Sequence, residues 1–118
     1  MLILKDLIGI PWKDNGRTLD GFDCYGLAIE IEKRLGKNLK DVIYNNHSEE
    51  LENINVPTLN VEKTEKIEIG NIISMTIKSE LHIGVIISDK EFIHATRNQG
   101  VRISLISNYK IKNIYKVI

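Results

Sequence analysis

One amphipathic pattern stands out in this 118-residue chain, directly after a loop rich in glycine and aspartate. Between Cys24 and Leu35, apolar residues recur at the spacing of a helix that buries one face. Gly36 follows at the position where glycine commonly ends a helix. The pattern therefore predicts a helix that begins near Cys24 and stops before Gly36. Its apolar positions are Cys24, Leu27, Ala28, Ile31 and Leu35.

The rest of the chain predicts strands and loops. Residues 2–8 indicate a short helix, and residues 37–69 read as polar loop with one short helix near Ser48. After Gly70, β-branched runs alternate with turn residues. A helical half followed by consecutive strands indicates a single α+β domain, 1–118, with the helix on an antiparallel meander of about five strands. The expected strands are 71–78, 81–88, 91–95, 100–105 and 112–118.

Composition excludes several classes of function. Sixteen basic and sixteen acidic residues give zero formal net charge, so no nucleic-acid or anionic-membrane partner is expected. A single cysteine excludes an internal disulfide and any CxxC site. No apolar run approaches the ~20 residues of a membrane span. Lys5 and Asp6 interrupt the apolar N-terminus, which predicts no signal peptide and a protein that is cytoplasmic as synthesised.

Cys24 is the first candidate for chemistry. A thiol in the first turn of a helix lies near unpaired backbone N–H groups and the positive end of the dipole, which favour the thiolate. This position is typical of a nucleophile. The alternative is that Cys24 is a small buried hydrophobic residue, as most single cysteines are.

His82 and His94 lie on consecutive predicted strands, twelve residues apart. A two-residue turn at 89–90 would place the two imidazoles on opposite faces, whereas a three-residue turn at 88–90 would pair Gly84 with His94 and place both on one face. Asp-Lys is a poor type I′ or II′ turn, so we expect the three-residue turn. The alternative is a pair of histidines that bond backbone groups at a sheet edge.

A thiol at a helix start and two polar strand residues match the nucleophile, base and orienter of papain-like chemistry. This assembly requires the helix to pack on the face that carries both histidines. The competing assembly is a metal site formed by Cys24, His82 and His94, with His47 or a carboxylate as the fourth ligand. We otherwise interpret His47 as a solvated loop residue.

Several motifs, in matching order, resemble the NlpC/P60 cell-wall cysteine peptidases. GRTLDGFDCYGL (16–27) resembles the family's nucleophile motif, and GNIISM (70–75) resembles the strand that precedes the base. HIGVIISDKEFIHA (82–95) resembles the block that carries the two histidines, and the Gly-Val-Arg run at 100–102 fits the next strand. The resemblance covers residues 9–36 and 69–106, and the segment 37–68 has no counterpart.

The resemblance implies a papain-like fold and a thiol hydrolase that cleaves peptide bonds in peptidoglycan stem peptides. It implies Cys24 as the nucleophile, His82 as the base and His94 as the orienting third residue. It implies no metal and no cofactor. The partner would be the peptidoglycan peptide, with no role for nucleic acid or membrane.

Two departures from the family pattern concern the surroundings of the nucleophile. Tyr25 stands where the family usually has serine, and Trp12 stands where the family has a tyrosine near the oxyanion hole. Trp12, Asp23 and Tyr25 are therefore the candidates for substrate or oxyanion contacts. The Pro-Trp pair and the aromatic after the cysteine resemble the branch found in phage tails, which implies tail proteins as partners and a place in the virion. The alternatives are a non-catalytic tail assembly module, or an amidase or acyltransferase on the same fold.

Overall fold

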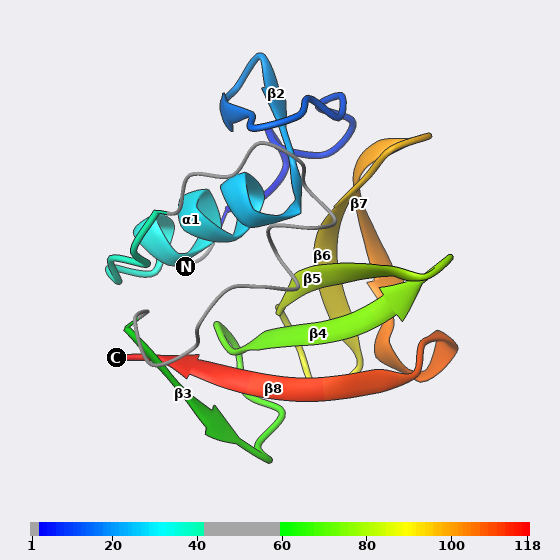
Figure 1. Cartoon of the computed structure of the whole chain (residues 1–118). Helices are drawn as coiled ribbons and strands as arrows, with labels where there is room; N and C mark the ends of the chain where they lie inside the picture. The colour runs from blue at the N-terminus through cyan, green and yellow to red at the C-terminus, as the bar shows by residue number, and fades with distance from the viewer. Residues whose placement is uncertain (1–2, 42–59) are drawn as a thin grey trace.

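The computed structural model describes residues 3–41 and 60–118, and there it places one helix against a six-stranded antiparallel sheet (Figure 1). The strand order is β3-β8-β4-β5-β6-β7, and a two-stranded β1-β2 ribbon precedes the helix. No helix in these two segments is long and apolar enough to cross a membrane. The elements are β1 (Arg17–Thr18), β2 (Gly21–Phe22), α1 (Cys24–Arg34), β3 (Val61–Thr64), β4 (Ile72–Ile77), β5 (Glu80–Ile86), β6 (Glu91–Thr96), β7 (Gly100–Leu105), the 3₁₀ turn η2 (Ile106–Asn108) and β8 (Ile111–Val117).

Helix α1 begins and ends where the sequence predicts. Asp23 is the N-cap, with extended backbone and a side chain that accepts the Gly26 N–H. At the other end Gly36 has φ of +82°, a left-handed conformation that glycine adopts without a steric penalty. The N–H groups of Gly36 and Lys37 bond the carbonyls of Lys33 and Glu32, which is the Schellman arrangement.

The strand prediction is confirmed for five elements, and the topology is corrected. β4 to β7 form the expected meander, but β8 returns to pair with β4 rather than with β7. Strand β3, which pairs with β8 at the outer edge, was expected as loop. Its sequence, Val-Glu-Lys-Thr, is short and mostly polar, so its pairing depends on β8 rather than on its own hydrophobic pattern.

The two short helices predicted outside α1 have different outcomes. Residues 5–9 form turns with i to i+3 bonds, such as Leu7 N–H to the Leu4 carbonyl, so the predicted helix over 2–8 is wrong in its described part. A segment this short does not offset the cost of nucleating a helix. The predicted helix near Ser48, together with His47, lies outside the described residues.

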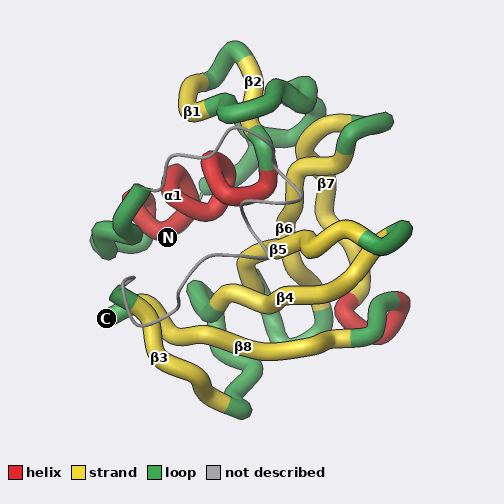
Figure 2. The backbone as a smooth tube through the Cα atoms, in the orientation of Figure 1, coloured by secondary structure: helices red, strands yellow, loops and turns green. Residues whose placement is uncertain are grey.

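The two faces of the sheet carry different groups. Helix α1 packs on the face formed by Ile83, Val85, Ile93 and Ala95. The opposite face carries a second apolar cluster of Ile73, Met75, Ile86, Phe92 and Ile106. In Figure 2 the helix lies along one side of the sheet, and β6 and β7 turn away from β4 and β8.

Both histidines belong to the face that the helix does not cover. Side chains alternate along a strand, so His82 shares its face with Ile86, and His94 shares its face with Phe92. The prediction that the helix packs on the histidine face is therefore wrong. The helix instead covers the more continuously apolar face, where Ile83 and Val85 lie.

The predicted hairpin register is confirmed. β5 and β6 pair Val85 with Ile93 and Ile86 with Phe92, and the N–H of Ile87 bonds the carbonyl of Glu91. The turn is therefore the three-residue one at 88–90. Continued along the strands, this register places Gly84 opposite His94 and both imidazoles on one face.

The β4–β5 turn supplies a first prediction. Lys78 and Ser79 form a two-residue loop with φ of 49° and 68°, the sign pattern of a type I′ turn. Asn and Gly adopt these angles at lower cost, so Lys78→Asn with Ser79→Gly should raise the free energy of unfolding by about 1 kcal/mol. Urea denaturation measures this change in the free energy of unfolding.

Asp89→Gly is the control, because its turn has no residue with positive φ, and it should lower stability. Loss of stability in the variant with both Lys78→Asn and Ser79→Gly would contradict the turn assignment.

The buried carboxylate of Glu32 supplies a second prediction. Glu32 is fully buried, and neither of its oxygens has a hydrogen-bond partner among the residues that the structure describes. Burial raises its pKa to about 7 despite the opposing charge of Lys37. A raised folded-state pKa favours the protonated form, so this contribution to stability is present below about pH 4.5 and is lost as pH rises through 7.

Glu32→Gln removes this titration while keeping the shape of the side chain. Between pH 4.5 and about pH 8 the wild-type protein should lose about 2 to 3 kcal/mol of unfolding free energy relative to the variant. Chemical denaturation at the two pH values checks this. An equal pH dependence in both proteins would show that Glu32 does not titrate in this range.

Candidate active site

The loop before the helix fixes the position of Cys24. Asp23 is fully buried, and its Oδ1 accepts the Gly26 N–H at 2.7 Å and the Arg17 guanidinium at 2.9 Å. A Cβ on Gly26 would overlap the carbonyl oxygen of Gly16, so the loop closes directly on the first helical turn. Cap, ion pair and close approach together hold the cysteine at the helix start.

The thiol of Cys24 is 1% exposed, and this burial raises its pKa well above the ordinary value. Backbone N–H groups of Ile83, Cys24 and Tyr25 act in the opposite direction, and the Asp23 carboxylate raises the pKa further. The helix start therefore does not by itself produce the thiolate that the sequence suggested. Burial therefore opposes ionisation of this thiol.

The thiol meets the sheet at a gap between two strands. β5 pairs with β6 only at Val85 and Ile86, so the first half of β5 has no partner on that side. In this register the N–H of Ile83 points toward β6. It donates a hydrogen bond to the Cys24 sulfur rather than to a strand partner. The sulfur therefore lies against the backbone of the residue next to His82, although helix and histidines are on different faces.

The two histidines are brought together as predicted by the register. His82 Nε2 and His94 Nδ1 are 2.8 Å apart, and the rings meet edge to face at an interplanar angle of 70°. Both side chains are buried. Since His94 bonds side chains on both of its nitrogens, the alternative of backbone-bonded edge histidines does not hold for it.

The surroundings of His94 keep it neutral. Burial, together with the positive charge of Arg102 directly across the strand pair, lowers its pKa to about 4. The rings of Phe92 and Tyr109 lie 4.4 and 5.6 Å from its ring, centroid to centroid. At neutral pH His94 is therefore an uncharged ring with one donor and one acceptor nitrogen.

Sequence reasoning missed one polar neighbour, Ser104 on β7. Its Oγ lies 2.9 Å from His94 Nε2. The β6–β7 register pairs His94 with Arg102, so Ser104, two residues along, shares that face. Alternation along the strand 100–105 shows that Ser104 and Arg102 share a face. That this face meets His94 follows only when the register of the β6–β7 hairpin is known.

A cavity of about 460 Å³ opens beside both histidines. The N-terminal loop contributes Trp12 and the β6–β7 turn contributes Arg97, whose guanidinium lies 4.8 Å from the Trp12 ring centre. Its other lining residues come from the β4–β5 turn, strand ends and the segment after η2: Ile77, Lys78, Glu80, Leu81, Thr96, Asn98, Gln99 and Tyr109.

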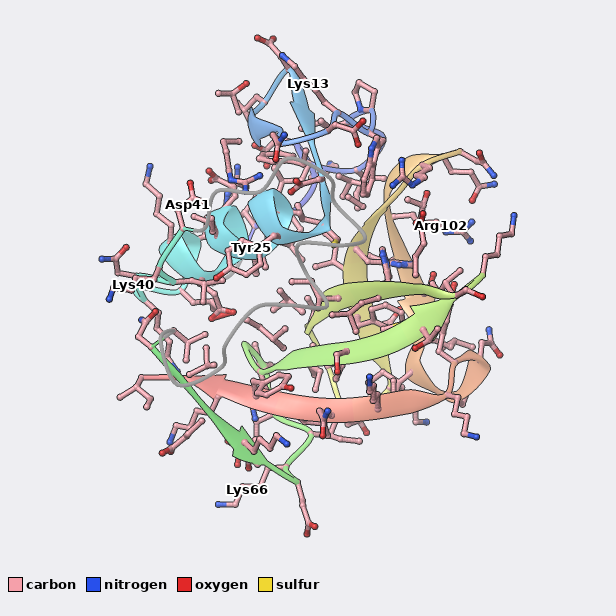
Figure 3. All side chains as sticks on the ribbon, in the orientation of Figure 1. Lys13, Tyr25, Lys40, Asp41, Lys66 and Arg102 are labelled. Carbon is pink, nitrogen blue, oxygen red and sulfur yellow. The ribbon has the colours of Figure 1, made fainter. Side chains whose placement is uncertain are left out.

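The three further site candidates lie in different places. Trp12 lines the cavity, and its Nε1–H donates to Asp14 Oδ1 at 3.0 Å. Asp23 caps the helix and, as a carboxylate, accepts rather than donates hydrogen bonds. The Tyr25 hydroxyl donates to the Lys40 carbonyl at 2.6 Å, and Figure 3 shows this tyrosine toward Lys40, with Arg102 on the other side of the molecule.

The metal-site alternative does not fit the geometry. Zinc holds each imidazole nitrogen at about 2.0–2.1 Å in a tetrahedral arrangement, which leaves no room between nitrogens that face each other at 2.8 Å. Among residues 3–41 and 60–118, no group of three or more His, Cys, Asp or Glu side chains is arranged to hold a metal ion. His47, the suggested fourth ligand, lies outside that part of the chain.

Comparisons with known proteins identify relatives of this arrangement. The sequence model of the NlpC/P60 family matches residues 9–118. A search of curated protein sequences found no match. Among solved structures, the NlpC/p60 domain of the peptidoglycan hydrolase SagA superposes with a TM-score of 0.63 at 14% identity, over 92% of this chain and 87% of that one.

Two further structures show the same fold in longer chains. NlpC2 from Trichomonas vaginalis has a TM-score of 0.68 at 22% identity, over 97% of this chain but 44% of that one. An NlpC/P60 family protein from Bacillus cereus has a TM-score of 0.61 at 21% identity, over 92% of this chain but 35% of its own. At these identities the likeness establishes the fold.

The cap at Asp23 supplies a third prediction. Asp23→Ala removes both the acceptor for the Gly26 N–H and the partner of Arg17, and should lower the free energy of unfolding by about 2 kcal/mol. Asp23→Asn keeps the acceptor for the Gly26 N–H, so its free energy of unfolding should fall by less. Thermal and urea denaturation of the two variants measure the difference, and equal losses would mean that the ion pair rather than the cap holds the helix start.

Proposed function

Because the chain belongs to the NlpC/P60 family, we propose that it is a thiol hydrolase that cleaves peptide bonds in the stem peptides of peptidoglycan. The observation that carries the proposal is the hydrogen-bonded pair of His82 and His94, set beside the backbone that the Cys24 sulfur contacts. In this proposal Cys24 is the nucleophile, His82 is the base and His94 is the orienting group. Buried imidazoles in direct contact are suited to proton transfer.

In the proposed reaction the Cys24 sulfur attacks the carbonyl carbon of the substrate amide. His82 takes the thiol proton on Nδ1 and then delivers it to the leaving amine as the C–N bond breaks, which leaves a thioester on Cys24. Water attacks the thioester, and His82 accepts its proton. The C–S bond then breaks, His82 returns its proton to the sulfur, and the carboxylic acid product leaves.

This role fixes the tautomers of both rings. A base that accepts at Nδ1 carries its neutral-state proton on Nε2, so His82 donates from Nε2 to His94 Nδ1. When His82 becomes positively charged, a neutral His94 can still accept that hydrogen bond. The low pKa of His94, about 4, keeps it available as the acceptor and leaves His82 as the ring that gains the proton.

The helix start would stabilise the negative oxygen that develops in the reaction. The backbone N–H groups of Cys24 and Tyr25 lie beside the sulfur, and donors in this position are suited to an oxyanion. In this proposal the indole of Trp12 contributes to the cavity wall. The Tyr25 hydroxyl, bonded to Lys40, acts in the fold only.

Peptidoglycan is proposed as the substrate because the family is typically one of cell-wall hydrolases and the SagA domain is named a peptidoglycan hydrolase. The cavity beside the histidines is large enough for part of a peptide, and its rim carries charges of both signs from Lys78, Glu80 and Arg97. We extend the proposal to action within a phage tail, with tail proteins as partners. This extension depends on the Pro11-Trp12 pair and on Tyr25 after the cysteine.

A non-catalytic tail module is the second candidate, and the burial of Cys24 favours it. A thiol that is 1% exposed and has a raised pKa is unreactive unless substrate or motion opens the gap. An amidase or acyltransferase would use the same three side chains on a different bond. These candidates differ in their products, so product analysis separates them.

Digestion of purified peptidoglycan, followed by mass spectrometry of the released fragments, tests the proposal. Cys24→Ala and His82→Ala should each abolish release, and the double variant should be no worse, since the two side chains act as one unit. His94→Ala should retain measurable activity. Lys112→Ala, on exposed surface of β8, is the control and should behave like wild type.

The outcomes separate the candidates. Fragments with newly freed amino and carboxyl groups within the stem peptide support the peptidase. Activity that survives in Cys24→Ala would exclude Cys24 as the nucleophile. Intact peptidoglycan with a folded wild-type protein would favour the assembly module.

A further inference from the structure

His94 makes a second hydrogen bond, on the side away from His82. Its Nε2 lies 2.9 Å from Ser104 Oγ, on the neighbouring strand β7. Within the described residues, the only hydrogen bonds of the His94 ring are those to His82 and Ser104. Three side chains on three adjacent strands therefore form a continuous chain of hydrogen bonds.

We propose that Ser104 is a positioning residue that accepts a hydrogen bond from His94 Nε2 and so stabilises the tautomer of His94 that a protonated His82 requires. This inference rests on the proposed function of the Cys24 site and adds a fourth side chain to it. Ser104 does not touch the reacting atoms. It acts on the far nitrogen of the third residue.

The protons on the three side chains depend on one another. When His82 carries a proton on both nitrogens, its Nε2–H must donate to His94 Nδ1. A neutral His94 that accepts at Nδ1 carries its own proton on Nε2, which must donate to an acceptor. Ser104 Oγ occupies the position of that acceptor. A buried N–H without it would lose a hydrogen bond at the step where His82 becomes charged.

The opposite tautomer would disable the base. If His94 carried its proton on Nδ1, it would donate to His82 Nε2, and the neutral His82 would then carry its proton on Nδ1. That nitrogen could no longer accept the proton of the thiol. A hydroxyl can donate or accept, so Ser104 permits both states, but only its accepting state is compatible with a protonated His82.

The structure also explains why this hydroxyl is held in place. Ser104 faces Phe92 across the β6–β7 pair and lies on the same face as His94, so the strand register fixes the distance between them. Ser104 is half-buried, whereas Arg102, directly opposite His94, is exposed. The charge of Arg102 disfavours a second proton on His94 and so preserves the accepting nitrogen.

Four variants test the inference. Ser104→Ala removes the acceptor, Ser104→Thr keeps the hydroxyl, and Ser104→Asp supplies a group that only accepts. Ser107→Ala, in the exposed part of η2, is the matched control. Each is measured for kcat and KM on peptidoglycan fragments, and for the histidine tautomers by ¹⁵N NMR of the free protein.

We expect kcat of Ser104→Ala to fall about tenfold with KM unchanged. This is the effect of losing one hydrogen bond to a group that becomes charged. Thr and Asp should restore kcat to within about threefold of wild type. In the NMR spectra the wild-type His94 should carry its proton on Nε2, and Ser104→Ala should contain both tautomers. If Ser104 served only in packing, kcat would be no higher in Ser104→Asp than in Ser104→Ala.

Other results would overturn the inference. Wild-type kcat and an unchanged His94 tautomer in Ser104→Ala would show that Ser104 has no positioning role. Failure of the proposed function is distinguishable, because it would appear as full activity in Cys24→Ala or no hydrolysis by wild type. In either case the tautomers still decide the role of Ser104.

Discussion

The three-residue turn at 88–90 is the constraint on which the proposed site depends. It fixes the register that places His82 and His94 on one face, where their nitrogens lie 2.8 Å apart. A slip by one residue would move His94 to the helix-covered face and break that bond. Gly84 completes the arrangement, because a Cβ there would collide with the ring of Phe92. The space that glycine leaves is filled by this ring, which packs against His94.

The second constraint is the position of the thiol in a gap between strands. Cys24 starts a helix on one face of the sheet, and the histidines occupy the other. β5 separates from β6 beyond Val85, which leaves the Ile83 N–H to the sulfur and brings the thiol to the backbone next to His82. Burial there raises the pKa of the thiol more than the nearby N–H groups lower it. In this account reactivity comes from the histidine pair rather than from the helix start.

The helix and most strands could be predicted from the sequence because they depend on residues close together in the chain. The apolar spacing after Cys24 and the glycine at 36 define the helix, and the β-branched runs define five strands. Other features depend on distant residues. Alternation shows which side chains share a face but not which face the helix covers, and β3 is too polar to reveal its pairing with β8. Ser104 becomes visible only when two registers are combined.

The central claim is that His82 acts as the base for a buried Cys24. The rate of alkylation of Cys24 by iodoacetamide at pH 7, in folded wild type and in His82→Ala, tests it directly, with the denatured protein as the reference. The account predicts that His82→Ala reacts at least about tenfold more slowly than wild type, because the buried thiol ionises only when His82 takes its proton. Equal rates in the two folded proteins, or reaction only after denaturation, would contradict it.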